Sequence, residues 1–194
     1  MSDFWMHAQF GSEHASTVQN ESKRKECLQR LKMATKELIV LSVDSSALSA
    51  DVMNEFCEAL EAILLHHIKD TNAITTSSGT RQASDVQTAG GIFWACLMKT
   101  FGEKSTRLSL IKSKEKPSQG AIANLRVLES LERDFVLTHC RSDLIKVRAW
   151  ILQALNMNVL TYCVSAVLAD KSAGSLYTET SFMRNHEAIS MLRS

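Results

Sequence analysis

Two stretches of sequence decide the fold of this chain, and both predict buried helices. The first is Lys146-Val147-Arg148-Ala149-Trp150-Ile151-Leu152-Gln153-Ala154-Leu155, where a tryptophan stands among aliphatic residues. The second comes earlier, as Phe56-Cys57-Glu58-Ala59-Leu60-Glu61-Ala62-Ile63-Leu64-Leu65-His66-His67-Ile68-Lys69. Apolar residues cover more than half the circumference of the first helix, which is typical of a helix at the centre of a bundle.

The composition of the chain is that of an ordinary globular domain. Of 194 residues, 45% are hydrophobic and 22% are charged, which is enough to build a core. The formal net charge of +1 does not indicate a nucleic-acid or membrane-surface role. No apolar run approaches the ~20 residues that span a bilayer, and no secretory signal is visible. The five cysteines include no CxxC pair, so we expect reduced thiols in the cytosol.

The spacing of apolar residues predicts an all-α fold, because steps of three and four recur and strand-like alternation is absent. One proline and seven glycines leave few breaks between helices. We expect a flexible N-terminal tail over residues 1–20, which carries Phe4, Trp5 and Phe10, followed by a helical domain over 21–194. The expected helices cover residues 21–41, 92–100 and 118–135, with others beginning near Ser49, Ser142, Asn158 and Asn185.

Catalytic constellations are weak in this sequence. His66-His67 is not part of an HExxH motif, and we expect His67 to be a core or boundary histidine on the apolar stripe. His139-Cys140 pairs a base with a thiol, but neighbouring residues on a helix do not face each other. We therefore expect no enzyme activity, no cofactor and no metal site.

Other candidate features also have plain structural explanations. Gly90-Gly91 lacks the rest of a phosphate-binding loop and is expected to start a helix. The lysines at 112–116 lack interleaved aromatic residues, so a solvated loop is favoured over a nucleic-acid surface. Trp150 is expected in the core rather than as an interface anchor. Arg148 lies on a mostly apolar helix, where it is either a structural tie or a charged point at the mouth of a groove.

Several blocks, taken in order, resemble the RUN domain family. Residues 56–69 are similar to an early block of the family, with His67 where glycine is usual. Phe93-Trp94 resembles an aromatic-tryptophan step, and residues 158–170 resemble a later helix, after which Tyr177 and Phe182 resemble aromatic positions. The best marker of the family reads glycine-arginine-glycine-arginine-alanine-tryptophan.

Residues 145–150 are similar to that marker, with Ile145 and Val147 in place of its two glycines. The resemblance covers about residues 21–194, with an apparent helical insertion around 118–135. The chain ends within the last helix of the family pattern, which suggests a piece of a larger protein or a short form.

The resemblance implies a compact bundle of about eight helices that binds proteins. Its expected role is that of an effector or adaptor for a GTP-loaded Rab, Rap or Arf-like small GTPase in endosomal, lysosomal or autophagic vesicle trafficking. Kinesin or another adaptor is a further expected partner, nucleic acid is not, and membranes are reached only through the GTPase. The expected location is cytoplasmic, peripheral to endosomal or lysosomal vesicles.

Four basic residues are expected to contact the protein partner, chosen for their charge and location. They are Lys146, Arg148, Lys112 and Lys114. The alternative function is an all-α scaffold that binds a partner protein helix, such as one from a motor or adaptor, independently of any GTPase.

Overall fold

All regular secondary structure in the described part of the chain is helical, which confirms the all-α fold. The computed structural model describes residues 3–43, 50–69, 83–102, 117–134, 136–170, 174–179, 181–184 and 189–190. These ranges contain seven α-helices, one π-helical turn and one 3-10 turn. The chain divides into two units, Met1–Ile63 and Leu64–Ser194.

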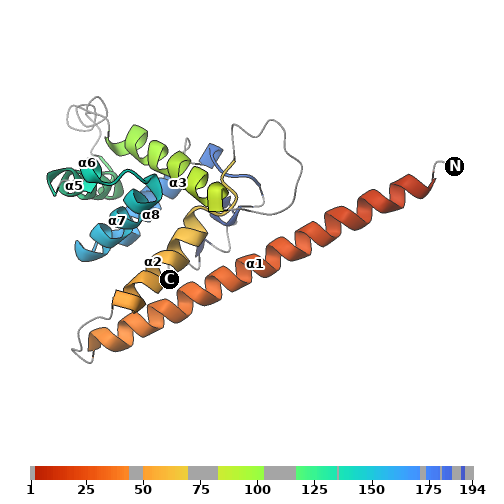
Figure 1. Ribbon diagram of the computed structural model, residues 1–194, viewed down its shortest axis with the longest axis horizontal. Helices are drawn as coiled ribbons and strands as arrows, with labels where there is room; N and C mark the ends of the chain where they lie inside the picture. Colours follow the sequence, from red (N-terminus) through yellow and green to blue (C-terminus); the bar gives the residue numbers. More distant parts are fainter. Residues whose placement is uncertain are drawn as a thin grey trace. The chain divides into compact units, whose positions relative to one another are not determined.

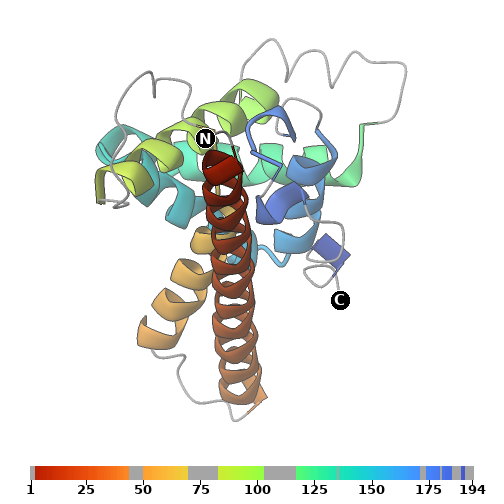
Figure 2. The same ribbon diagram turned by 90° about the vertical axis from the view of Figure 1, so that its right-hand side faces the viewer.

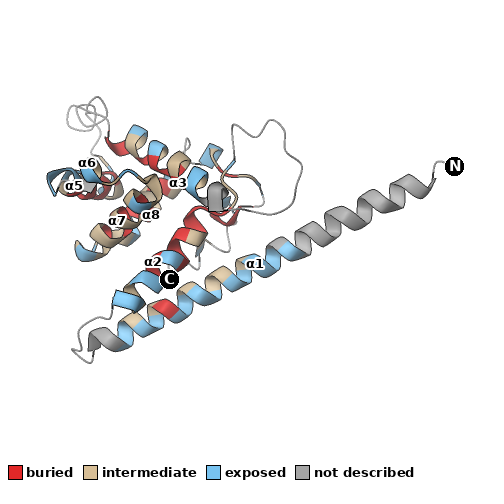
Figure 3. Cartoon of the chain, viewed as in Figure 1, coloured by how far each residue is buried: buried red, intermediate tan, exposed pale blue. Residues whose placement is uncertain are grey.

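The first unit contains two helices, α1 (Asp3–Val43) and most of α2 (Ala50–Leu64). They lie side by side and antiparallel (Figures 1 and 2), and the Arg30 Nη2 lies 2.7 Å from the Glu55 Oε1. This partner raises the pKa of Arg30, although an exposed ion pair stabilises a fold only slightly. In the part of α1 whose side chains are described, most residues are exposed and Ala34 is the single buried one (Figure 3).

The start of α1 differs from the sequence prediction. The helix begins at Asp3, whereas the spacing of apolar residues predicted a start near Glu21. The first part of this stretch has no apolar stripe, so a method based on periodicity could not find it. The expectation of a separate flexible tail over residues 1–20 stays a prediction.

The second unit gathers five α-helices into one bundle (Figures 1 and 2). They are α3 (Ala83–Leu97), α5 (Gln119–Arg133), α6 (Val136–His139), α7 (Asp143–Asn156) and α8 (Leu160–Ala169). The π-helical turn η1 (Met98–Gly102) continues α3, and the 3-10 turn η2 (Phe182–Arg184) lies near the chain end. Because α7 packs against α3, α5, α6 and α8, its predicted central place is confirmed.

Two serines precede helices as predicted, but they act differently. The Ser118 hydroxyl accepts a hydrogen bond from the Ala121 N–H at 3.2 Å and so caps α5. Ser142 stands at the start of α7 without capping it, because its hydroxyl bonds instead to the side chain of Gln87. Asn158, expected to start a helix, has a φ of 56° and ends α7, so α8 begins at Leu160.

Glycines inside the helices set how closely these helices approach. Gly90 and Gly91 lie within α3, so the prediction that they start a helix was wrong. A Cβ atom on Gly90 would lie 3.2 Å from the Cα atom of Leu144 in α7. A Cβ atom on Gly120 would lie only 2.5 Å from the carbonyl oxygen of Tyr162 in α8. The contact at Gly120 leaves no room for a side chain, and the contact at Gly90 leaves little.

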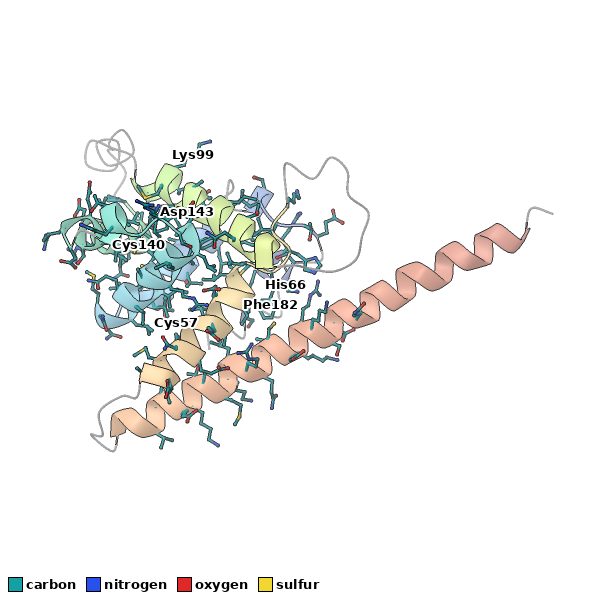
Figure 4. All side chains as sticks on the ribbon, viewed as in Figure 1. Cys57, His66, Lys99, Cys140, Asp143 and Phe182 are labelled. Carbon is teal, nitrogen blue, oxygen red and sulfur yellow. The ribbon has the colours of Figure 1, made fainter. Side chains whose placement is uncertain are left out.

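The segment that follows α2 is joined to a segment near the chain end. The Lys69 N–H donates to the Leu176 carbonyl at 2.7 Å, and the Thr178 N–H donates to the His67 carbonyl at 3.1 Å. His66 is buried, and its Nδ1 accepts a hydrogen bond from the Phe182 N–H at 3.2 Å (Figure 4). These bonds tie residues 66–69 to residues 176–182.

The sequence predicted that His67 lies on the apolar stripe of α2, but His67 does not continue that stripe. The helix ends at Leu64, and His67 follows in a turn with a φ of 55°. Its neighbour His66 is the buried histidine, and the two rings lie 4.2 Å apart between centroids. No helix in the described ranges is both long enough and apolar enough to cross a membrane.

Candidate functional site

The inner face of α7 is held by a hydrogen-bonded core. Trp150 is fully buried, and its Nε1 donates to the Asn124 Oδ1 at 3.0 Å. The Asn124 side-chain amide in turn donates to the carbonyls of Gly120 and Cys163, at 3.1 and 3.0 Å. The Phe93 ring meets Trp150 edge-on, with centroids 6.0 Å apart. The core assignment of Trp150 is therefore confirmed, and α7 is fixed to α3, α5 and α8.

A polar cluster lies where the start of α7 meets α3. The Gln87 Nε2 lies 3.0 Å from the Ser142 Oγ, and the Asp143 Oδ1 lies 2.7 Å from the Lys146 Nζ. The Asp143 carboxylate also lies over Gly91, since a Cβ atom there would be 3.5 Å from its Oδ2. Figure 4 shows Asp143 at this end of the bundle, with Cys140 close by. The cluster orients the first turn of α7.

The structure places two of the four basic residues that the sequence suggested, Lys146 and Arg148. Lys146 has a side chain only 18% exposed and is paired with Asp143, and Arg148 is half-buried. At 3.6 residues per turn, two positions turn the helix by about 200°, so these two residues lie on different sides of α7. Lys112 and Lys114 lie outside the described residues. The expectation that the four residues form one site therefore stays a prediction.

Sequence reasoning missed an apolar row on the outer side of α7. Ile145 is 52% exposed, and Ala149 and Leu152 are half-buried. These residues follow one another at steps of four and three and so share one face of the helix. We call this row the outer stripe. The sequence did place them on one line, but it gave no sign that this line faces outward.

The described residues give little support for a small-molecule, catalytic or metal site. A hollow beside α3 and α8 leaves no room for a water molecule. Its lining residues are Phe93, Cys96, Leu97, Thr100, Phe101, Val167, Asp170 and Leu176. Burial raises the pKa of the Cys96 thiol, and it raises that of Cys163 to about 12, so neither is a ready nucleophile. The described residues hold no cluster of three or more histidine, cysteine, aspartate or glutamate side chains suited to a metal ion.

The comparison with known families explains this arrangement. A model of the RUN domain family matches residues 55–194. The chain belongs to the RUN domain family. The match takes in the whole second unit and α2 from Glu55 onward, so it is shorter than the resemblance over residues 21–194 and leaves α1 outside. RUN domains are protein-interaction modules that generally bind small GTPases. No solved structure matches the chain.

The residues that mark this RUN domain serve mainly its fold. Trp150 and Val147 are fully buried, as is Phe93 of the aromatic-tryptophan step. His67 stands where the family usually has glycine, and its φ of 55° lies in the left-handed region that glycine enters without strain. The family pattern at this turn therefore reflects a backbone conformation. Ile145, by contrast, is 52% exposed on the outer side of α7.

Proposed function

We propose that this RUN domain is an effector or adaptor for a GTP-loaded small GTPase of the Rab, Rap or Arf-like classes. The observation that carries the proposal is the family match over residues 55–194. The pathway is the trafficking of endosomal, lysosomal or autophagic vesicles. The domain works in the cytoplasm and reaches a vesicle membrane indirectly, through the GTPase that it binds. Kinesin or another adaptor is its second partner.

The preference for GTP arises from the conformation of the partner, and the domain supplies a rigid surface that binds the GTP-bound conformation better. Small GTPases order their switch loops around the γ-phosphate and release them after hydrolysis. A surface that fits only the ordered loops binds the two nucleotide states with different affinity, and that difference is the whole of the discrimination. Helix α7 suits this task because the bonds of Trp150 and Asn124 hold its inner face in place.

Basic side chains on and near α7 are proposed to attract the partner. The proposed contacts remain Lys146, Arg148, Lys112 and Lys114. Of these, Lys146 already shares its charge with Asp143, so it serves best at the edge of the contact. Charges at the rim of an interface act mainly on the association rate and on its dependence on salt.

The first experiment is a binding panel. The full chain is immobilised and exposed to purified Rab, Rap and Arf-like GTPases, each loaded with a GTP analogue or with GDP. Selective capture of a GTP-loaded member supports the proposal and identifies the pathway. Equal capture of both nucleotide states would favour the alternative, a scaffold that binds a partner protein independently of the nucleotide. Capture of none by the folded chain would contradict the effector proposal.

Neutralising the basic residues tests their part in that binding. Lys146→Gln and Arg148→Gln are each expected to weaken capture of the GTP-loaded partner by roughly three- to tenfold at low salt, and less at high salt. Lys112→Gln and Lys114→Gln are expected to act in the same direction. The matched control is Arg126→Gln, which removes an exposed charge from α5. A loss of the same size in the control would show that only overall charge matters.

A further inference from the structure

The two places where this chain departs from the glycines of its family have different surroundings. Val147 is fully buried on the inner face of α7. Ile145 is 52% exposed, on the outer side of the same helix. Core packing accounts for an apolar residue at position 147, because burying a valine side chain stabilises the fold. The isoleucine at position 145 has no comparable reason within the domain.

Ile145 is the exposed end of a longer apolar row whose other two residues are half-buried. It begins the outer stripe, which continues through Ala149 and Leu152 at steps of four and three. Such spacing forms one apolar row along a helix, the arrangement by which helices dock against partners. The opposite face is locked by the buried bond between Trp150 and Asn124. A partner that meets the outer stripe therefore does not have to order this helix first, which lowers the cost of binding.

Two arginines lie beside the outer stripe in the segment 136–156. Between residues 136 and 156 the only acidic residue is Asp143, and it is paired with Lys146. Arg141 is exposed just before α7, and Arg148 lies three residues after Ile145 on the same side of the helix. The surface is therefore apolar at its centre and basic at its edge. It complements a partner surface that is apolar at its centre and acidic at its edge.

We propose that Ile145 is a specificity-determining anchor of this RUN domain. Its side chain packs against an apolar residue in the ordered switch region of the GTP-loaded partner, while Arg141 faces an acidic group on the same partner. The inference rests on the proposed function and names the contact that selects the partner.

Four substitutions at two positions test the anchor against the GTPase that the panel captures. Ile145→Ala removes the apolar contact, Ile145→Met keeps it, and Ile145→Glu adds a charge that opposes an acidic rim. Tyr162→Ala is the matched control, because Tyr162 is a similarly exposed apolar residue, at 45%, on α8. The dissociation constant is measured by titration with the GTP-loaded partner, and circular dichroism verifies that each variant is folded at the temperature of the titration.

We expect Ile145→Ala to weaken binding by roughly ten- to a hundredfold, in the range of an interface hot spot. Ile145→Glu is expected to weaken it further, whereas Ile145→Met and Tyr162→Ala stay within about threefold of the wild type. Binding by Ile145→Ala within twofold of the wild type would overturn the inference and leave the proposed function standing. If the wild type binds no GTPase in either nucleotide state, both fall together.

Discussion

Asn124 joins three helices through one side chain. It is fully buried in α5, accepts from Trp150 in α7 and donates to the Cys163 carbonyl in α8. Asn124→Ala leaves the Trp150 N–H buried without its acceptor. We expect the free energy of unfolding, measured by urea denaturation, to fall by about 2–4 kcal/mol.

A double-mutant cycle separates this hydrogen bond from packing. Trp150→Phe removes the N–H donor, so adding Asn124→Ala to it should cost less than Asn124→Ala does alone. We expect a coupling free energy of about 1–2 kcal/mol between the two residues. Strictly additive costs would show that the bond from Trp150 to Asn124 contributes little to stability.

The residue scale also shows what the sequence could and could not predict. Trp150 was placed in the core correctly, because aliphatic neighbours surround it in the chain. Ile145 and Val147 carry the same apolar signal, yet one is exposed and the other buried, because α3, α5 and α8 decide which side of α7 faces inward. Ser118 and Ser142 were both expected at helix starts, but only Ser118 caps its helix, because Ser142 bonds to Gln87, 55 residues away in the chain.

At the scale of elements, two helix pairs depend on a missing side chain. Gly120→Ala would place a Cβ atom 2.5 Å from the Tyr162 carbonyl oxygen and 2.7 Å from the Ala166 Cβ atom, so α5 and α8 must move apart. We expect the free energy of unfolding to fall by about 2–4 kcal/mol. Gly90→Ala should cost less, because its closest atoms in Leu144 lie at 3.2 Å.

Gly174→Ala is the matched control for these substitutions. A Cβ atom at Gly174 would meet nothing within 4 Å, and the backbone there does not need a positive φ. We expect a change within about 0.5 kcal/mol, or slight stabilisation from the less flexible unfolded chain. Equal losses in thermal or urea unfolding for Gly120→Ala and Gly174→Ala would show that helix contact is not the cause.

The ends of the elements were the least predictable part of the fold. Periodicity found α2, α5 and α7, because each has a buried stripe. It missed the first half of α1 and the first turns of α3, where no such stripe marks the helix. Helix α5 is the helix expected as an insertion in the family pattern, and it supplies the buried Asn124 and the Gly120 contact with α8. The contacts that its residues make show the importance of α5 to the fold better than the length of the expected insertion does.

At the scale of the whole molecule, the fold could be predicted better than the candidate site. The family motifs contain Phe93, Val147 and Trp150, which are buried, so recognising them amounts to recognising the core. A binding surface has no such constraint from packing, and helical spacing shows only that Lys146 and Arg148 lie on different sides of α7, not which side faces outward. The outer stripe could be seen only once the inward face of α7 was known.

The second unit should also lose stability at alkaline pH through its buried thiol. Burial raises the pKa of Cys163 from 9.0 to about 12, so the folded state keeps a proton that the unfolded state releases. The stabilisation is complete below pH 9 and is lost as the pH rises toward 12. Burial likewise raises the pKa of Tyr177, which adds to the same trend. Cys163→Ala removes only the thiol, because Asn124 bonds to the backbone carbonyl of that residue.

Urea denaturation of the wild type and of Cys163→Ala at pH 8 and at pH 10.5 isolates this effect. Tyr177 is present in both proteins, so its titration cancels in the difference between them. At pH 8 the wild type is expected to be more stable, since the variant loses packing. By pH 10.5 that advantage should shrink by roughly 1–2 kcal/mol, because the thiol ionises only in the unfolded wild type. An advantage that is the same at both pH values would mean that the folded domain tolerates the Cys163 thiolate.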